Sequence, residues 1–232
     1  MKTNWWSRFL DFISPRLCVV CGERLAPTER SVCSVCVLHL PRTTFQFTPE
    51  DNPMARLFWG LAPIERASAL FYYEPHSEMA QIIYSMKYDN QPDIGEDMGR
   101  LMAREMQLAR FFDGIDMLMP VPLSRKRQRQ RGYNQSERLA RGISDITHLP
   151  VVVNVLCRKH FRQSQTSLSR QDRQQNVSDM FYLRHDKQLE GKHVLLIDDI
   201  CTTGATLTAC ANVLKTIPKI RISILTCGFT HH

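Results

Sequence analysis

The sequence predicts an α/β protein in which a parallel sheet is flanked by helices and preceded by a small cysteine-rich unit. Short apolar, β-branched runs alternate with helix-length segments after about residue 45, a pattern typical of parallel sheets. Two Cys-x-x-Cys pairs lie within the first 45 residues. One apolar run ends in two adjacent aspartates and continues into a threonine-rich loop that opens a helix. Each observation locates one part of the molecule.

Composition excludes several protein classes. The chain has 232 residues, of which 43% are hydrophobic and 23% charged, with a net charge of +7. These values exclude a disordered, collagenous or membrane-embedded chain. No apolar stretch approaches the roughly 18 residues of a membrane span, and residues 1–15 lack the uninterrupted apolar run of a secretory signal. We therefore expect a cytoplasmic protein, in which thiols stay reduced and can hold a metal.

Two units follow from this organisation. Residues 1–45 are predicted to form a short aromatic helix and the cysteine-rich unit, and residues 46–232 the α/β domain. Prolines mark the linker between them. Residues 158–178 are polar, rich in Gln, Ser and Arg, and predict a long flexible loop, which in a compact domain is usually functional or disordered.

The strands and helices of the larger unit are predicted from the spacing of apolar residues and from the prolines and glycines that interrupt regular structure. The second strand stops at Pro120, because proline cannot extend a central strand. Strands are predicted over residues 67–73, 115–119, 151–156, 193–197 and 221–227. Helices are predicted over residues 77–87, 94–110, 133–146 and 207–215.

The cysteine pairs predict a structural zinc site. They read Cys18-Val-Val-Cys21-Gly22 and Cys33-Ser-Val-Cys36, and four thiolates at this spacing can close a tetrahedron around zinc. Four protein ligands leave no open position for catalysis. A redox-active Cys-x-x-Cys is the competing interpretation, but two adjacent copies without a preceding strand favour zinc.

The segment 193–207 predicts a site for a phosphorylated ligand. Helix N-terminal amides and threonine hydroxyls bind phosphate, and Gly204 lets the backbone come close. Asp198 and Asp199 suit a pair of hydroxyls or a Mg²⁺ ion beside that phosphate, as in a phosphorylated sugar. The common nucleotide-binding loops, with G-x-x-x-x-G-K-[ST] or G-x-G-x-x-G, are absent. The alternative is that the two aspartates only cap a helix.

Positive charge is concentrated in one part of the chain. Residues 121–184 contain 13 basic residues against 4 acidic ones, a net of +9. Such a block attracts polyanions, either a small phosphorylated ligand or a nucleic acid backbone. The alternative is an ordinary solvated basic surface.

These motifs together resemble a known family. Residues 194–206 resemble the signature of type I phosphoribosyltransferases, which bind 5-phosphoribosyl 1-pyrophosphate (PRPP). With a zinc-ribbon head and three further motifs, the chain resembles the ComF family of competence-associated proteins over nearly its whole length. The motifs are Pro120-Val-Pro-Leu, Arg131-Gly-Tyr-Asn-Gln-Ser136, and Gln165-x-x-Leu168 with Arg173-x-x-Asn176.

The resemblance implies a type I phosphoribosyltransferase fold with a small hood and an assignment of the site. Asp198 and Asp199 would be the catalytic pair that engages the ribose hydroxyls, directly or through Mg²⁺. The flexible loop would close over the substrate. The implied PRPP contacts are Thr202, Thr203, Gly204, Ala205 and Thr206 for the 5-phosphate, and Ser124, Arg125 and Lys126 for the pyrophosphate.

The resemblance also implies a role in DNA uptake during natural transformation, with PRPP and Mg²⁺ bound. One alternative is a phosphoribosyltransferase of nucleotide or nucleoside metabolism, whose acceptor is recognised by a hood at residues 58–93. There Lys87 is a candidate contact, or else a surface lysine. The other is a protein that binds single-stranded DNA or docks competence proteins and has a vestigial PRPP site. Tyr133, Phe161 and Phe181 are its candidate stacking groups.

Overall fold

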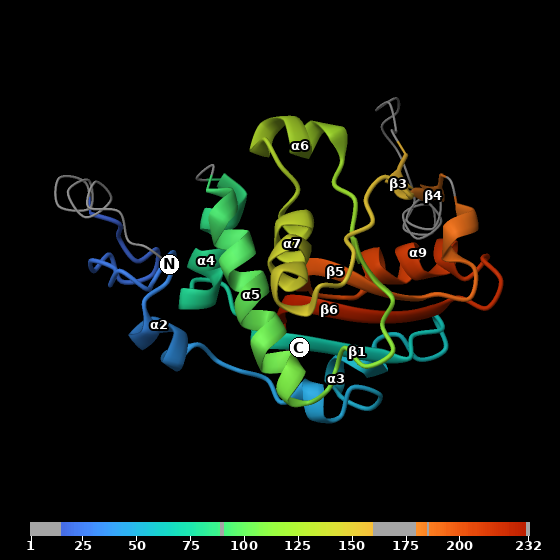
Figure 1. The fold of residues 1–232 in the computed structure, drawn as a ribbon, viewed down its shortest axis with the longest axis horizontal. Coiled ribbons are helices and arrows are strands. Elements are labelled where there is room, and N and C mark those ends of the chain that lie inside the picture. The colour runs from blue at the N-terminus through green and yellow to red at the C-terminus, as the bar shows by residue number, and fades with distance from the viewer. Residues whose placement is uncertain (1–14, 89–90, 160–179, 185, 231–232) are drawn as a thin grey trace, which may run out of the picture.

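A four-stranded parallel sheet forms the centre of the molecule (Figure 1). The computed structural model describes residues 15–88, 91–159, 180–184 and 186–230. All neighbouring strands of the sheet are parallel, so their carboxyl ends lie at one edge. Its order is β1 (Arg66–Tyr72), β6 (Arg221–Phe229), β5 (His193–Cys201) and β2 (Met117–Pro120).

The sheet is buried on both faces. In β5, Val194 and Leu196 belong to one apolar cluster, while Leu195 and Ile197 belong to the other. All four side chains are fully buried. Successive side chains of a strand point to opposite faces, so a continuous apolar run is what a strand covered on both sides requires.

Helices cover the two faces of the sheet (Figure 1). The helices α4 (Glu78–Tyr88), α5 (Pro92–Leu108) and α7 (Gln135–Thr147) pack on one face. The other face is covered by the 3-10 helix η1 (Phe45–Phe47), α3 (Pro53–Arg56) and α9 (Ala205–Leu214). A further 3-10 helix, η2, spans Asp186–Leu189. No helix in the described parts of the chain is long and apolar enough to cross a membrane.

Helices α5 and α7 approach each other closely through glycine. A Cβ atom at Gly99 would lie 2.2 Å from the Leu139 carbonyl oxygen, and one at Gly142 would lie 2.0 Å from the Glu96 carbonyl oxygen. Any side chain there would push the helices apart. This contact places the first turn of α7, including Ser136, beside the carboxyl edge of the sheet.

A two-stranded antiparallel sheet lies over α9, and a short helix lies over α7 (Figure 1). Strand β3 (Leu156–Arg158) pairs with β4 (Phe181–Leu183). Helix α6 (Arg125–Arg131) follows β2 and has no buried residue. Apolar periodicity predicts neither feature, because β3 and β4 have only three residues each and α6 is polar throughout.

The predicted strand over residues 151–156 is wrong. Val151 forms only an isolated parallel bridge to Leu118, and the chain then leaves the sheet. Val153 and Asn154 are exposed, and Asn154 has a left-handed backbone with φ 66°. This conformation ends an extended run and turns the chain into β3.

Most other predicted elements agree with the structure to within a few residues. The region 58–93, where the hood is expected, contains β1 and α4, which match the strand and the helix predicted there. The N-terminal aromatic helix falls on residues 1–14, and most of the predicted flexible loop falls on residues 160–179. Both ranges lie outside the described residues.

The cysteine-rich head is attached to α5. The Ser31 hydroxyl donates a hydrogen bond to Asp97, and Arg30 lies 3.8 Å from the same carboxylate. Val19, Val20 and Val32 pack against the apolar cluster beneath α5. Helix α2 (Ser34–His39) ends the head. Residues 41–43 then run along β1 and join the head to the sheet.

Candidate functional site

Asp198 and Asp199 lie near the carboxyl end of β5, where the strand leaves the apolar core. Asp198 Oδ1 accepts hydrogen bonds from Ser136 Oγ at 2.8 Å and from the Asp199 amide at 2.9 Å. Asp199 Oδ2 lies 2.8 Å from Lys87 Nζ, at the end of α4. The side chains of Lys87 and Asp199 are 21% and 15% exposed, so this ion pair is largely shielded from water. Three separate elements therefore meet at the acidic pair.

The electrostatics of the pair show that it requires positive charge. Burial raises the pKa of Asp198 to about 7, and the neighbouring Asp199 carboxylate adds to the rise. The hydrogen bond from Ser136 and the charge of Lys87 oppose that rise only in part. Two adjacent carboxylates in a low-dielectric site repel, so a bound cation or a pair of hydroxyl donors would stabilise the ionised form.

A pocket of about 170 Å³ opens above the acidic pair. Its remaining walls include Arg127 and Arg131 from α6, Arg158 from β3, and the loop 121–123 after β2. Burial lowers the pKa of Arg158, and the charge of Arg127 lowers it further. The guanidinium groups of Arg127 and Arg158 share this space, and neither forms an ion pair with a carboxylate in the part of the chain that the structure describes. The wall opposite the aspartates therefore attracts a multiply charged anion.

The threonine-rich loop lies next to this pocket and leads into α9. Residues 202–206 line a hollow of about 40 Å³ together with Asp198. Gly204 caps α9 with φ 73°, and a Cβ atom there would lie 3.1 Å from Cε1 of Phe58. Both observations favour glycine. Amides in the first turn of a helix have no partner within it, so this hollow suits a phosphate group.

The residues predicted for the pyrophosphate lie at the start of α6. Ser124 caps α6, because its Oγ accepts a hydrogen bond from the Arg127 amide at 3.3 Å. Arg125 is exposed and lines a neighbouring pocket of about 190 Å³. Lys126 is exposed on the same helix. The structure thus places Arg127 and Arg131, rather than these three residues, at the wall of the pocket that holds the acidic pair.

Sequence reasoning missed several residues of this pocket. The ion pair with Asp199 excludes the interpretation of Lys87 as an ordinary surface lysine. Arg131 and Ser136 begin and end the motif Arg131-Gly-Tyr-Asn-Gln-Ser136, and that motif is the signal by which the sequence marks them. For Arg127 and Arg158, the sequence offers no indication of a place in the pocket beyond their position in a basic segment.

The stacking groups predicted for single-stranded DNA do not fit the structure. Tyr133 and Phe181 are buried, with 8% and 3% of their surface exposed. The Tyr133 hydroxyl donates to the Met86 carbonyl at 2.7 Å, which makes it a structural contact between α4 and the segment before α7. Phe161 lies outside the described residues. A base therefore cannot stack on Tyr133 or Phe181 as placed.

The four cysteines of the head meet at one point. Their sulfur atoms all lie within 4.8 Å of one another, and the Cys21 and Cys33 sulfurs are 3.8 Å apart. Thiolates bound at about 2.3 Å to a tetrahedral zinc lie about 3.8 Å apart, so the cluster fits that ion. Amides also donate to sulfur, from Cys33 to Cys18 at 3.3 Å and from Cys36 to Cys33 at 3.5 Å.

The thiols of the cluster interact strongly. Burial raises the pKa of Cys36, and the neighbouring cysteines raise it further. Burial also opposes ionisation of Cys18, yet backbone amide hydrogen bonds outweigh it and lower the pKa to about 7. Four thiolates cannot coexist at this distance without a cation. The donor set and its geometry fit a metal ion with four sulfur ligands.

The chain matches known proteins over most of its length. Residues 88–226 match the family model described as phosphoribosyl transferase domain. The chain is 28% identical over 210 residues to the DNA utilization protein YhgH of Escherichia coli K12, covering 86% of this chain and 91% of that protein. It is 31% identical over 157 residues to competence protein F of Haemophilus influenzae, covering 66% of this chain and 67% of that protein.

Solved structures give a weaker likeness. The chain is 19% identical to a structure of the allosteric regulatory enzyme of purine biosynthesis, with a TM-score of 0.40. The matched part covers 60% of this chain and 29% of that one. The family match, together with the parallel sheet flanked by helices, confirms the predicted fold class.

Proposed function

Because the chain belongs to the ComF family of competence-associated proteins and contains a phosphoribosyl transferase domain, we propose that it binds PRPP with Mg²⁺ beside Asp198 and Asp199. The observation that carries this proposal is the pairing of opposite charges across one pocket. Two carboxylates form one wall and three arginines belong to the others, with a phosphate-sized hollow at the adjoining helix terminus. PRPP carries a diol, a pyrophosphate and a 5-phosphate in a matching order.

Each part of PRPP has a group in the pocket that suits it. Asp198 and Asp199 accept hydrogen bonds from the ribose hydroxyls. Residues 202–206 bind the 5-phosphate through hydroxyls and amides at the start of α9. Arg127, Arg131 and Arg158 hold the pyrophosphate.

The same residues support phosphoribosyl transfer. The bond from ribose C1 to the pyrophosphate oxygen breaks while a bond from C1 to the acceptor forms, and positive charge builds on the ribose ring. The aspartates face that positive charge, and the arginines receive the negative charge of the leaving pyrophosphate. Asp198 and Asp199 would hold Mg²⁺ when it is bound, and the ion would supply positive charge that stabilises the leaving pyrophosphate. The shared pocket holds these groups in place before reaction.

A thermal-shift titration tests PRPP binding. PRPP with Mg²⁺ should raise the melting temperature of the wild type, because a ligand that binds only the folded state stabilises it by mass action. Asp198→Asn with Asp199→Asn should lose that shift. Asp113→Asn removes a carboxylate that is 57% exposed and does not line the pocket, so it should keep the wild-type shift. Absence of a wild-type shift at millimolar PRPP would contradict the proposal.

Catalysis requires a second measurement. We propose that the protein transfers the phosphoribosyl group to an acceptor, and release of pyrophosphate in the presence of candidate bases, nucleosides and amines is the readout. Release with a nucleobase or nucleoside would assign the protein to nucleotide metabolism. A PRPP-dependent thermal shift without pyrophosphate release from any acceptor would instead support a binding role.

The cysteine cluster is proposed to hold one structural zinc ion. Cys18, Cys21, Cys33 and Cys36 supply four sulfur ligands and leave no position for substrate. Reduced thiols of this kind belong in the cytoplasm, which we propose as the location.

A role in DNA uptake or utilization is the second part of the proposal. Support comes from relatives named for DNA utilization and for competence, and from the exposed basic helix α6. We propose that PRPP binding and DNA handling use the same domain and that the zinc head contacts competence proteins. The rival scaffold model, with a vestigial PRPP site, predicts no thermal shift with PRPP.

A further inference from the structure

Two exposed tyrosines lie side by side on the outer face of α4. Tyr84 is 59% exposed and Tyr88 is 60% exposed, although the helix buries its opposite face in the core. Their ring centroids are 4.7 Å apart and the ring planes are inclined by 41°. Large aromatic side chains are costly to expose, and two in contact present a continuous π surface to solvent. We name Tyr84 and Tyr88 the tyrosine pair.

The tyrosine pair borders a cavity of about 530 Å³. None of the described residues that line this cavity is acidic, and its walls combine apolar surface with a few hydrogen-bonding groups, among them His76, Ser77 and Gln81. Ring faces with polar groups near their edges are the features that recognise a nucleobase.

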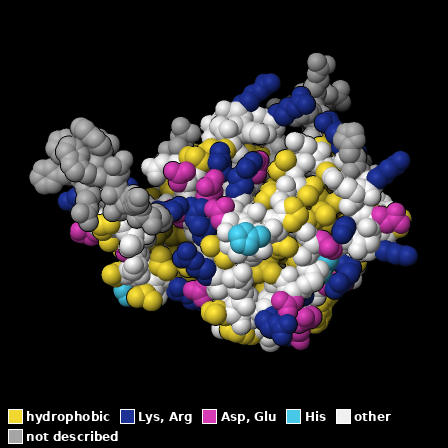
Figure 2. Space-filling model, in the orientation of Figure 1, with side chains coloured by type: hydrophobic (Ala, Val, Ile, Leu, Met, Phe, Trp, Pro, Cys, Tyr) yellow, Lys and Arg dark blue, Asp and Glu magenta, His cyan; other side chains and the backbone are white. Residues whose placement is uncertain are grey.

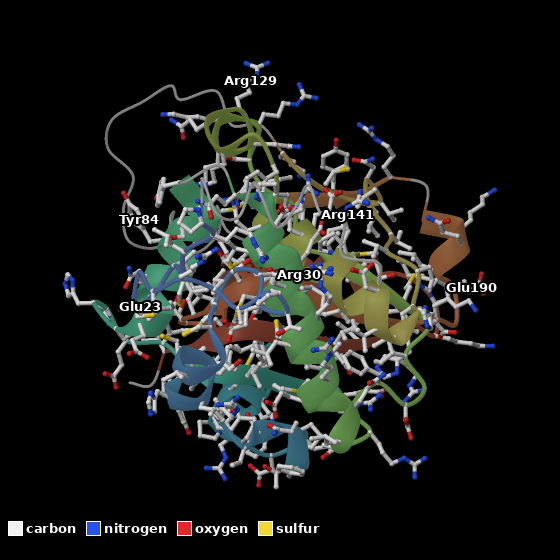
Figure 3. All side chains as sticks on the ribbon, turned by 60° about the vertical axis from the view of Figure 1, so that its left-hand side comes forward. Glu23, Arg30, Tyr84, Arg129, Arg141 and Glu190 are labelled. Atoms are coloured by element: carbon white, nitrogen blue, oxygen red, sulfur yellow. The ribbon has the colours of Figure 1, made fainter. Side chains whose placement is uncertain are left out.

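A cationic surface begins at the edge of the tyrosine pair. The Arg131 guanidinium lies 5.4 Å from the centre of the Tyr88 ring and joins α4 to α6. Within its seven residues, α6 carries four other cations and no acidic side chain, and all four are exposed. Figure 2 shows Lys and Arg side chains projecting at the top of the view, over α6. Figure 3 shows Arg129 pointing into solvent from α6 and Tyr84 on the outer side of α4.

Lys87 connects this surface to the PRPP pocket. Its side chain lines both the cavity beside the tyrosine pair and the pocket that contains Asp199. The two hollows are therefore neighbours, separated by the last turn of α4. A ligand in one lies close to a ligand in the other.

We propose that the tyrosine pair and α6 form a binding site for single-stranded nucleic acid, with bases on the tyrosines and the phosphate backbone along α6. This inference deepens the DNA role proposed above and rests on it. The charge of α6 matches a polyanion, and the exposed rings match unpaired bases. Bases stacked in a duplex would not reach ring faces on a helix surface. A single strand can place its bases on the tyrosine rings and its phosphates along α6 at the same time.

Fluorescence anisotropy separates stacking from charge. The probes are a labelled oligothymidylate of about 12 nucleotides, an abasic strand of equal length, and a duplex, all at one salt concentration. The wild type should bind the oligothymidylate at least about fivefold more tightly than the abasic strand, since stacking contributes about 1–3 kcal/mol per base. Tyr84→Ala with Tyr88→Ala should bind the two strands equally.

Matched variants exclude other causes. Tyr84→Phe with Tyr88→Phe keeps both rings and should keep the preference for the base-containing strand. Trp59→Ala removes another exposed aromatic, 58% exposed and also beneath an arginine, and should change nothing. Arg129→Ala should weaken binding of both strands equally and, in a separate salt titration with the oligothymidylate, reduce the salt dependence of binding. Equal wild-type binding of the thymidylate and abasic strands would overturn the proposal, as would tighter binding of the duplex.

The PRPP thermal shift is measured on the same variants. Tyr84→Ala with Tyr88→Ala should keep the wild-type shift, because neither tyrosine lines the PRPP pocket. A variant that keeps the PRPP shift but loses the strand preference supports the tyrosine site. A wild type that shows the strand preference but no PRPP shift would remove the PRPP proposal and leave this one standing.

Discussion

The cysteine cluster and the acidic pocket are assembled in opposite ways. The four cysteines of the cluster lie between Cys18 and Cys36, one pair in a turn and the other at the start of α2, so the whole cluster comes from one short segment of the chain. The pocket draws on α4, the loop after β2, α6, α7, β3 and the segment from β5 to α9. A site made by local turns can be recognised in the sequence, whereas one built from distant segments depends on how the helices pack. The comparison predicts different responses to mutation.

Removal of the metal ligands has the largest expected effect. Cys36→Ala should abolish zinc binding and unfold residues 15–40, because structural zinc contributes roughly 10 kcal/mol to small metal-bound units. Metal analysis and hydrogen exchange across the head measure this. Cys157→Ser, outside the cluster, serves as the control. If the head is locally assembled, the PRPP thermal shift survives; a purified wild type without zinc would contradict the metal site.

The second-largest effect is expected for the arginines that line the pocket of the acidic pair. Arg158→Ala should weaken PRPP binding about tenfold or more, because a charge-assisted hydrogen bond contributes about 1.5–3 kcal/mol. Lys159→Ala is the matched control, since Lys159 is the adjacent cation and is exposed away from the pocket. Isothermal titration with PRPP and Mg²⁺ measures both. Equal losses in the two variants would mean that general charge, and not the pocket, holds the pyrophosphate.

Substitution of Gly204 tests how tightly the loop before α9 packs against Phe58. Gly204→Ala should destabilise the fold by about 1–3 kcal/mol, through its left-handed backbone and the contact with Phe58. Gly191 has a similar φ of 69°, but a Cβ atom added there would meet no atom within 4 Å. Gly191→Ala should therefore lower the free energy of unfolding by less than Gly204→Ala does. Denaturant unfolding of both variants isolates the Phe58 contact. Equal losses of unfolding free energy in the two variants would show that the left-handed backbone, and not the contact with Phe58, accounts for the effect.

The pH dependence of Asp198 is the smallest predicted effect. Below about pH 4 the carboxyl is protonated in both the folded and the unfolded states. Between about pH 4 and pH 7 the carboxyl ionises in the unfolded state while it keeps its proton in the folded state, so the free energy of unfolding falls as the pH rises. Above about pH 7 the carboxyl is ionised in both states, and the loss of stability is complete. Asp198→Asn should therefore melt a few degrees higher than the wild type at pH 8.

That difference should shrink as the pH is lowered toward 5. Differential scanning of the ligand-free proteins measures it, and Asp51→Asn, at an exposed carboxylate paired with Arg56, is the control. A melting-temperature difference that does not change with pH would contradict the raised pKa.

Prediction from sequence succeeded where the signal was local. The strands around β5 and the helices α5 and α7 follow from apolar runs and their period, because burial on both faces or on one face leaves a regular pattern. It failed over residues 151–156, because a left-handed residue such as Asn154 cannot be recognised from hydrophobicity. It also failed for the stacking groups, since an aromatic residue in a basic segment can equally be buried, as Tyr133 is.

By itself, the sequence determined the fold class, the cysteine cluster and the position of Asp198 and Asp199 next to a threonine-rich loop. Each of these follows from a pattern of residues that are close together in the chain. Only the tertiary structure decided what faces them. The ion pair of Lys87 with Asp199, the hydrogen bond from Ser136 and the approach of Arg158 join residues at least 40 positions apart. Their distances depend on the packing of α4 and α7 and on the position of the β3–β4 pair, which no local pattern encodes.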